Sequence, residues 1–303
     1  MPDNALTNTL GTTRWHVVGA GAIGSLFASF LQGMRCDISL IGRGEKVADT
    51  RIIQRAEVLT EHCFDSSCAA DTDFIEHLLV TTKAYDVASA VGALQHRISR
   101  ATQIVVLANG MGFMDELKQL GLSADYYFGT TTHGAHFNDS GILVHAGAGA
   151  TTLGQKNALT PNWFNHWQTA IPQCHWDTHI EQALWLKLAI NCAINPLTAL
   201  NQCPNGELHE RLELRSQVAA LCDEIMEISS SIGFSTVVKG LHQKVTQVIQ
   251  QTANNRSSML QDINNRKRTE IDYLSGYMER IARDNGINAI KNRDMLEQVK
   301  ALE

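Results

Sequence analysis

The first third of the chain alternates short apolar runs with stretches of helical pattern. Apolar runs at 15–18, 36–41, 77–82 and 103–108 have the length and β-branched content of buried parallel strands. Between the first two lies a helical stretch at 25–31, with Gly33 as a candidate C-cap. This order predicts βα units, and therefore a parallel sheet with helices on both faces.

Later in the chain the pattern first shortens and then becomes helical. Between 124 and 154 the β-like pieces are short, as in antiparallel additions at a sheet edge: 126–128, 130–133, 142–144 and 151–153. Helix-rich sequence begins near 161, and from 181 onward apolar residues recur at helical spacing. We predict helices over 207–231, 237–253 and 269–284. Thr269 would cap the last of these and place Glu270 in its first turn.

These patterns predict an N-terminal α/β domain of Rossmann type and an all-α C-terminal domain. We expect a flexible tail over 1–14, the Rossmann-type domain over 15–178 and the helical domain over 179–303. With 303 residues, 44% of them hydrophobic, the chain can bury a core in each. A substrate cleft would then lie between the two domains.

Composition limits the partners. The net charge of −6 and the lack of a long basic run argue against nucleic acid. No apolar stretch reaches membrane-spanning length without interruption, and residues 1–15 lack the pattern of a signal peptide. Seven scattered cysteines without a C-x-x-C pair indicate reduced thiols. We therefore expect a cytoplasmic protein without a membrane or nucleic-acid partner.

Two histidine pairs raise the question of a metal. His133 and His136 lie in β-like sequence, where residues three apart point to opposite faces. His175 and His179 lie four apart, but no further ligands complete a set of four. We expect structural or solvent-facing roles and no metal.

A glycine motif follows the first strand directly. Gly19, Gly21 and Gly24 form G-x-G-x-x-G between a strand and a helix, which is the context that dinucleotide binding requires. The first glycine permits a tight turn, the second lets the backbone approach a pyrophosphate, and the third lets the helix pack closely. We assign cofactor binding to the whole turn: Gly19, Ala20, Gly21, Ala22, Ile23 and Gly24.

The end of the second strand indicates which dinucleotide binds. An enzyme for NAD usually has an acidic residue there for the ribose hydroxyls. Here Arg43 comes first, and an arginine can pair with the 2′-phosphate of NADP. NADP is favoured, although Arg43 could be an exposed loop cation and Glu45 a ribose ligand.

Lys83 and Asn109 follow the next two apolar strands. In open α/β sheets, residues just past the carboxyl ends of the strands line the ligand crevice. Lys83 could meet a phosphate, and Asn109 could hold the nicotinamide ribose or the substrate. Either could instead cap its loop.

Three polar residues interrupt the apolar run at 185–205. Lys187, Asn191 and Asn195 lie at i, i+4 and i+8, on one face of a helix. They are suited to a small polyoxygenated acid, although a solvent-facing stripe would have the same spacing. Pro196 disfavours helical geometry at Asn195, so the helix should bend or stop there.

The residues together resemble the ketopantoate reductase (2-dehydropantoate 2-reductase) family, from about 15 to 290. The motifs that carry the resemblance are GAGAIGSL, LLVTTKAYD, ANGMG, GTTTHGAH, LWLKLAINCAINPLTAL, CPNGEL, SSMLQD and RTEIDYLSGY. The resemblance implies reduction of ketopantoate to (R)-pantoate with NADPH, on the way to pantothenate and coenzyme A.

The resemblance also implies roles for individual residues. Lys187 matches the proton donor, and Glu270 matches the carboxylate that contacts the cofactor. Burial would lower the pKa of Lys187 and Glu270 would raise it, and the sequence leaves that balance open. Substrate binding falls to Asn109, Asn191, Asn195, Asn205 and Ser258, and NADP binding to the glycine turn, Arg43, Lys83, Asn109 and Glu270. Asp86 departs from the family, whose members can carry glutamine there.

Two other functions stay open at this point. A relative could reduce another 2-oxo or 3-oxo acid with the same residues, or the chain could be a non-catalytic NADP-binding sensor. The set of Asn and Ser residues argues against the first, and Lys187 argues against the second. The protein would be a monomer or a homodimer.

Overall fold

Eleven strands form one sheet in the part of the chain that the computed structural model describes, which is residues 13–34, 36–42 and 49–303. They are β1 (Arg14–Val18), β2 (Asp37–Gly42), β3 (Asp49–Arg55), β4 (Val58–Cys68), β5 (His77–Val80), β6 (Gln103–Val106), β7 (Asp125–Thr131), β8 (Gly134–Phe137), β9 (Leu143–Gly147), β10 (Thr151–Gly154) and β11 (Cys174–Trp176). Their order across the sheet is β11-β10-β7-β6-β5-β1-β2-β4-β3-β9-β8.

The central strands are parallel and carry helices on both faces, as predicted. Strands β7, β6, β5, β1, β2 and β4 pair in parallel. On β6, Ile104 and Val106 pack in one core cluster with residues of α2 (Val87–Ala93) and α3 (Phe113–Gln119). Val105, on the other face, packs with α1 (Ala22–Gln32) and α4 (Phe164–Ala170). Because β1, β5 and β6 run the same way, their carboxyl ends lie at one edge.

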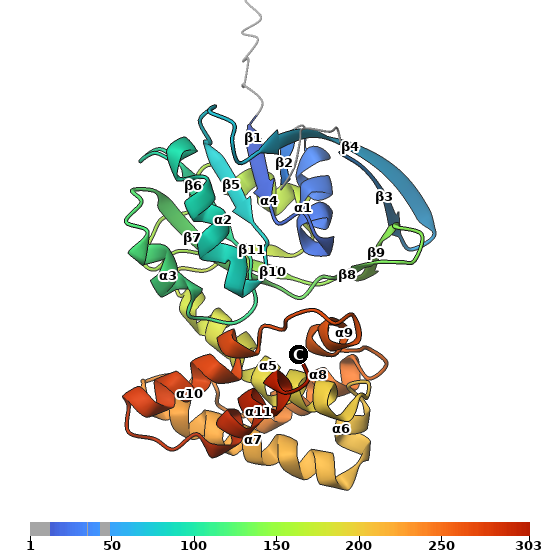
Figure 1. Ribbon diagram of the computed structural model, residues 1–303, viewed down its shortest axis with the longest axis vertical. Coiled ribbons are helices and arrows are strands. Elements are labelled where there is room, and N and C mark those ends of the chain that lie inside the picture. The colour runs from blue at the N-terminus through green and yellow to red at the C-terminus, as the bar shows by residue number, and fades with distance from the viewer. Residues whose placement is uncertain (1–12, 35, 43–48) are drawn as a thin grey trace, which may run out of the picture.

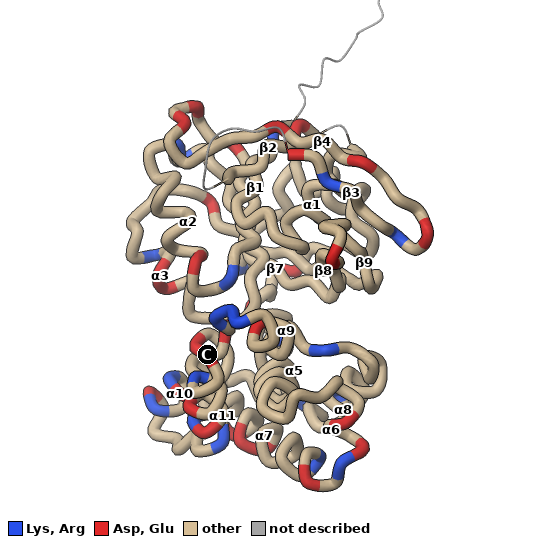
Figure 2. The backbone as a smooth tube through the Cα atoms, turned by 45° about the vertical axis from the view of Figure 1, so that its right-hand side comes forward, with Lys and Arg blue, Asp and Glu red and all other residues tan. Residues whose placement is uncertain are grey.

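A helical half follows the sheet half (Figure 1). Its elements are α5 (Ile180–Asn201), α6 (Glu207–Glu210), α7 (Leu212–Ser231), α8 (Leu241–Gln251), α9 (Ser258–Asn264), the 3-10 helix η3 (Ile271–Tyr273), α10 (Ser275–Asp284) and α11 (Ile290–Lys300). Short 3-10 helices η1 (Ala84–Asp86) and η2 (Gln95–Arg97) belong to the sheet half. Lys or Arg and Asp or Glu occur on both halves (Figure 2).

The central helix α5 does not stop near Asn195, and the prediction of a stop there is wrong. The helix contains Pro196 and continues to Asn201. Leu197, Thr198 and Ala199 are buried in the turn after the proline, so packing outweighs the local preference. By length and hydropathy alone, α5 could cross a membrane, but 67% of its most apolar stretch is buried inside the protein, as in a core helix.

Other predicted helices are shorter or divided. The helix predicted over 207–231 breaks at Arg211, which has an extended backbone (φ −84°, ψ 120°), into α6 and α7. The helix predicted over 237–253 is the shorter α8. The one predicted over 269–284 is interrupted at Leu274, where ψ is −99°, so that η3 and α10 are separate.

Strands β3 and β4 form a long antiparallel hairpin that the hydrophobic pattern did not predict. Ile52 and Leu59 are 45% and 56% exposed, and polar residues separate the apolar ones, so the hairpin lacks the apolar run of a buried strand. The pieces predicted at 126–128, 142–144 and 151–153 are the strands β7, β9 and β10. Their predicted place as antiparallel additions at the sheet edge is wrong for β7, which lies inside the sheet and pairs in parallel with β6. The piece predicted at 130–133 is a strand only in its first half, because β7 ends at Thr131 and β8 begins at Gly134.

Candidate active site

The turn between β1 and α1 holds glycines with different structural roles. Gly19 has φ +87°, and a Cβ there would lie 2.5 Å from the Thr82 backbone nitrogen. A Cβ at Gly24 would lie 2.5 Å from both the Gly19 carbonyl oxygen and the Thr81 hydroxyl oxygen. These two positions therefore require glycine for close packing. At Gly21 the nearest atom would be 3.9 Å away, and the residue is exposed, which leaves its backbone open to a bound group.

The start of α1 completes this turn. The helix begins at Ala22, and the first N–H groups of a helix have no partner within it. Ala20, Ala22 and Ile23 are only partly buried. An anionic pyrophosphate fits this geometry, because helix N-termini attract negative charge. Arg43, predicted to bind the 2′-phosphate, and Glu45 lie outside the described residues.

Lys83 and Asn109, from the loops after β5 and β6, meet one carboxylate of the helical half. Glu270 accepts hydrogen bonds from the Ala84 backbone nitrogen at 3.0 Å and from Asn109 Nδ2 at 3.3 Å. Lys83 Nζ lies 3.7 Å from Glu270 Oε2 and 2.5 Å from Asp262 Oδ2. The structure therefore brings three of the predicted site residues together, where the two halves touch.

Lys83 stays charged at this junction. Burial lowers the pKa of Lys83, but the carboxylates of Glu270 and Asp262 outweigh it, and the pKa lies above the ordinary lysine value. The Lys83 ammonium is therefore a positive charge held at the carboxyl edge of the sheet.

The predicted helical position of Glu270 is wrong. We expected it in the first turn of a long helix, but it precedes the three-residue η3. Nor is Thr269 the N-cap of this short element, because that position is Glu270 itself; the Thr269 hydroxyl accepts a hydrogen bond from the Ile271 nitrogen at 3.2 Å. Glu270 is only 5% exposed, and its carboxylate serves contacts with the sheet half.

Lys187 projects from α5 towards the end of β7. Its ammonium donates a hydrogen bond of 2.9 Å to the Thr131 carbonyl oxygen. Burial lowers the pKa of Lys187 to about 8, and the Glu270 carboxylate acts in the opposite direction. Burial therefore decides the balance that the sequence left open. A lysine with this pKa releases a proton near neutral pH, as a catalytic acid must.

A small cleft lies beside these residues. Its polar lining comes from the loop after β6, from α5, from α9 and from the residue before η3: Asn109, Asn195, Ser258, Asp262 and Glu270. The apolar side chains of Met259 and Leu274 complete it. Asn191 lies on α5 between Lys187 and Asn195, one turn from each. The stripe on α5 thus borders the cleft at Asn195.

Asn205 is not brought to this cleft. It is 7% exposed, and its Nδ2 donates to Thr252 Oγ1 at 2.8 Å, which fastens the loop after α5 to the end of α8. Its Oδ1 is buried without a hydrogen-bond partner.

Comparisons with known proteins agree with this geometry. Residues 15–158 match the family described as ketopantoate reductase PanE/ApbA, and residues 179–303 match its C-terminal domain. A 2-dehydropantoate 2-reductase of Vibrio cholerae is 36% identical over 295 residues, covering 95% of this chain and 97% of the relative. One of Salmonella typhimurium is 35% identical over 296 residues, covering 95% and 94%. The chain belongs to the ketopantoate reductase family.

Solved structures share the fold. A ketopantoate reductase of Ralstonia eutropha has a TM-score of 0.86 at 22% identity and covers 96% of this chain and 98% of its own. A D-mandelate dehydrogenase, solved with NADH and anilino(oxo)acetate, has a TM-score of 0.78 at 20% identity, with coverage of 96% and 98%. The same fold thus occurs in a protein named for a different dehydrogenase activity.

Two partners in this ketopantoate reductase site were missed by the sequence analysis. Asp262 lies four residues after Ser258 on α9, and Ser257 caps that helix by accepting from the Leu260 nitrogen. The Ser257 cap was a usable signal, because a helix starting there places Ser258 and Asp262 on one face. Thr131 acts through its backbone carbonyl, for which no residue type is a signal.

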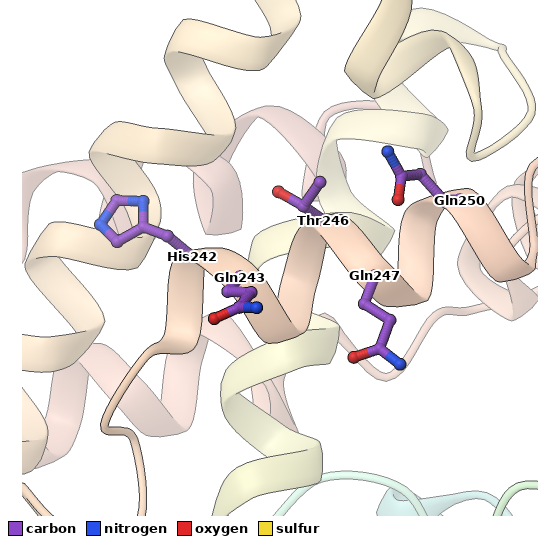
Figure 3. A pocket seen from close by; sticks show the side chains of 5 residues that line it. All are labelled: His242, Gln243, Thr246, Gln247 and Gln250. Atoms are coloured by element: carbon purple, nitrogen blue, oxygen red, sulfur yellow. The ribbon is translucent and has the colours of Figure 1, made fainter.

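Two other features lie apart from the cleft. His133 is buried, and its Nδ1 lies 3.1 Å from His145 Nε2 rather than pairing with His136. Among the described residues, no group of three or more His, Cys, Asp or Glu is placed to hold a metal. A shallow hollow elsewhere is lined by the polar face of α8 alone (Figure 3): His242, Gln243, Thr246, Gln247 and Gln250.

Proposed function

We propose that this chain catalyses the NADPH-dependent reduction of 2-dehydropantoate to (R)-pantoate, a step towards pantothenate and coenzyme A. One observation carries the proposal. In a chain of the ketopantoate reductase family, the partly buried Lys187 has a pKa of about 8 and lies on the helix face that leads to the polar cleft.

The residues of the sheet half fit NADPH. The open backbone at Gly21 and the start of α1 would take the pyrophosphate, and Arg43 would pair with the 2′-phosphate. Lys83, Asn109 and Glu270 would hold the remainder at the carboxyl edge of the sheet. NADPH, when bound, supplies the hydride for the 2-keto carbon.

Lys187 would act on the oxygen of that carbon. As the carbonyl oxygen gains negative charge, the ammonium stabilises it and then donates a proton, which leaves a neutral amine and an alcohol. A pKa of about 8 favours that neutral amine more than an ordinary lysine would, and solvent then returns the proton.

Asparagine and serine side chains would bind the substrate's carboxylate and hydroxyl. Asn109, Asn195 and Ser258 already line the cleft. Asn191 adjoins it on α5, while Asn205 joins the set by resemblance alone. Fixed hydrogen-bonding groups reject analogues that would leave a buried amide unpaired.

We further propose that residues 15–178 bind the cofactor and 179–303 carry the substrate and catalytic residues. The partner is a small molecule, in keeping with relatives that are named 2-dehydropantoate 2-reductase. All seven cysteines lie in the described residues and are free, which supports a cytoplasmic location. A monomer or a homodimer stays the prediction; a Staphylococcus aureus ketopantoate reductase of the same fold is described as dimeric.

The test follows the loss of NADPH absorbance with ketopantoate, beside NADH and other 2-oxo acids. Turnover that requires both NADPH and ketopantoate is the expected result. Turnover with another 2-oxo acid instead would keep the chemistry and discard the substrate. Tight NADPH binding without any turnover would contradict the proposal and indicate a sensor.

A further inference from the structure

The chain that follows α11 reaches back to the segment that carries Glu270. Both the backbone nitrogen and the hydroxyl of Thr269 donate to Glu303 Oε1, at 2.8 and 2.6 Å. Figure 1 shows this end of the chain in the helical half, near its boundary with the sheet half. A carboxylate that accepts two hydrogen bonds from one residue fixes both its backbone and its side chain.

The contact continues to the other side of Glu270. The Thr269 hydroxyl, held by Glu303, accepts from the Ile271 nitrogen at 3.2 Å. Thr269 and Ile271 are 1% and 0% exposed, so the bond between them is shielded from water, whereas Glu303 itself is an exposed residue. Both neighbours of Glu270 in the sequence are thereby tied to Glu303.

Glu270 needs such support, because it lies outside any α-helix. It precedes η3, a single 3-10 turn, and Leu274 separates that turn from α10. The hydrogen-bond donors to its carboxylate, Ala84 and Asn109, belong to the sheet half. The direction of the Glu270 side chain therefore depends on how the segment before η3 is held.

We propose that Glu303 is a positioning residue for the reaction. By holding Thr269, its carboxylate fixes the direction in which Glu270 points towards Asn109 and Lys83. This inference rests on the proposed function, since it assigns a role in the same site.

The first experiment compares Glu303→Ala, Glu303→Gln and the wild type in kcat/KM for ketopantoate against pH, at saturating NADPH. Glu303→Ala should lower kcat/KM several-fold and move the basic limb to lower pH, because a displaced Glu270 raises the pKa of Lys187 less. Glu303→Gln keeps an oxygen that can accept both bonds and should recover most of the loss. Glu297→Gln removes an exposed carboxylate from α11, the helix that precedes Glu303, and should change nothing.

Lys187 and the charged groups around Glu270 are the same in all of these variants. Glu270 is the charged group that acts on Lys187, and Lys83 and Asp262 face Glu270 in turn. The nearby ion pair of Lys300 Nζ with Asp272 Oδ1, at 2.5 Å, is also left intact. A shift of the basic limb therefore reports the placement of Glu270.

A second experiment asks whether Glu303 acts through Thr269. Thr269→Val keeps the backbone donor and removes the hydroxyl, which donates to Glu303 and accepts from Ile271. It should cause a similar loss, and the double variant with Glu303→Ala should be no worse than the more damaged single variant. Additive losses would overturn the inference.

Other outcomes separate this inference from the proposed function. A wild-type pH profile in Glu303→Ala would overturn the positioning role, even if the melting temperature fell, because a merely structural contact changes stability alone. If the wild type does not reduce ketopantoate, the proposed function fails by itself. The NADPH dissociation constants of the variants then test the positioning role alone. Weaker NADPH binding by Glu303→Ala than by Glu303→Gln supports that role, and equal dissociation constants contradict it.

Discussion

Glu270→Gln should move the basic limb of the pH profile to lower pH. The glutamine keeps an oxygen for the Ala84 and Asn109 donors but removes the negative charge. Burial lowers the pKa of Lys187 to about 8 while Glu270 holds it up, so loss of the charge leaves burial unopposed. Lys187 must be protonated to donate, and kcat/KM for ketopantoate should fall as pH passes its pKa.

The size of the effect follows from the protonated fraction. With a pKa of about 8, Lys187 is about nine-tenths protonated at pH 7, about half at pH 8 and about one-tenth at pH 9. The wild-type profile should therefore be flat up to about pH 7 and bend near pH 8. Each further unit by which the pKa falls costs about tenfold on the descending limb.

The assay measures kcat/KM for ketopantoate from pH 6 to about 10 at saturating NADPH. Lys83 does not interfere, because its pKa lies above the ordinary lysine value. Lys187→Ala should lower kcat by orders of magnitude, with NADPH affinity nearly unchanged, and so identifies the titrating group. A wild-type limb near pH 10, or a Glu270→Gln limb at higher pH than wild type, would refute the reasoning.

Three further predictions concern the sheet half. Gly24→Ala should lower both the melting temperature and the NADPH affinity, because the added Cβ would lie 2.5 Å from the Gly19 carbonyl oxygen. Gly21→Ala, whose Cβ would have no atom nearer than 3.9 Å, should weaken NADPH binding at nearly wild-type stability. Equal melting temperatures for the two variants would contradict the packing argument. Arg43→Ala should reduce the ratio of kcat/KM for NADPH over NADH, and an unchanged ratio would remove Arg43 from the 2′-phosphate site. Burial, and then Arg97, lowers the pKa of His16 from 6.5 to about 4, so the unfolded chain binds more protons between these values. Stability from His16 is therefore fully present above pH 6.5 and lost as pH falls through about 4, by about 3 kcal/mol in total. In urea unfolding, His16→Gln should flatten that dependence, while exposed His175→Gln should keep it.

The parallel core was predictable because its strands are buried on both faces. Strands such as β5 and β6 read as continuous apolar runs, and a polar residue after each strand marks the carboxyl edge. The hairpin of β3 and β4 gave no such signal, because it is half exposed and its apolar residues are interspersed with polar ones. In the helical half the type of element was right, but the break at Arg211 carries no local signal, because neither Gly nor Pro marks it.

The site was predictable only as far as each residue could be placed within its own element. Helical spacing placed Lys187 and Asn195 on one face, and strand ends placed Lys83 and Asn109 at one edge. The contacts of Glu270 join segments 161 to 186 residues apart, and no local pattern encodes such a separation.

The negative charge of Glu270 acts on both halves of the molecule. Its carboxylate accepts hydrogen bonds from the sheet half, which fixes the edge where the cofactor would lie. The same charge keeps the pKa of Lys187 from falling further under burial. A site of this kind requires the carboxylate to be held in one direction. Since no α-helix supplies that support, the contact of Thr269 with Glu303 gains its importance from the chemistry at Lys187.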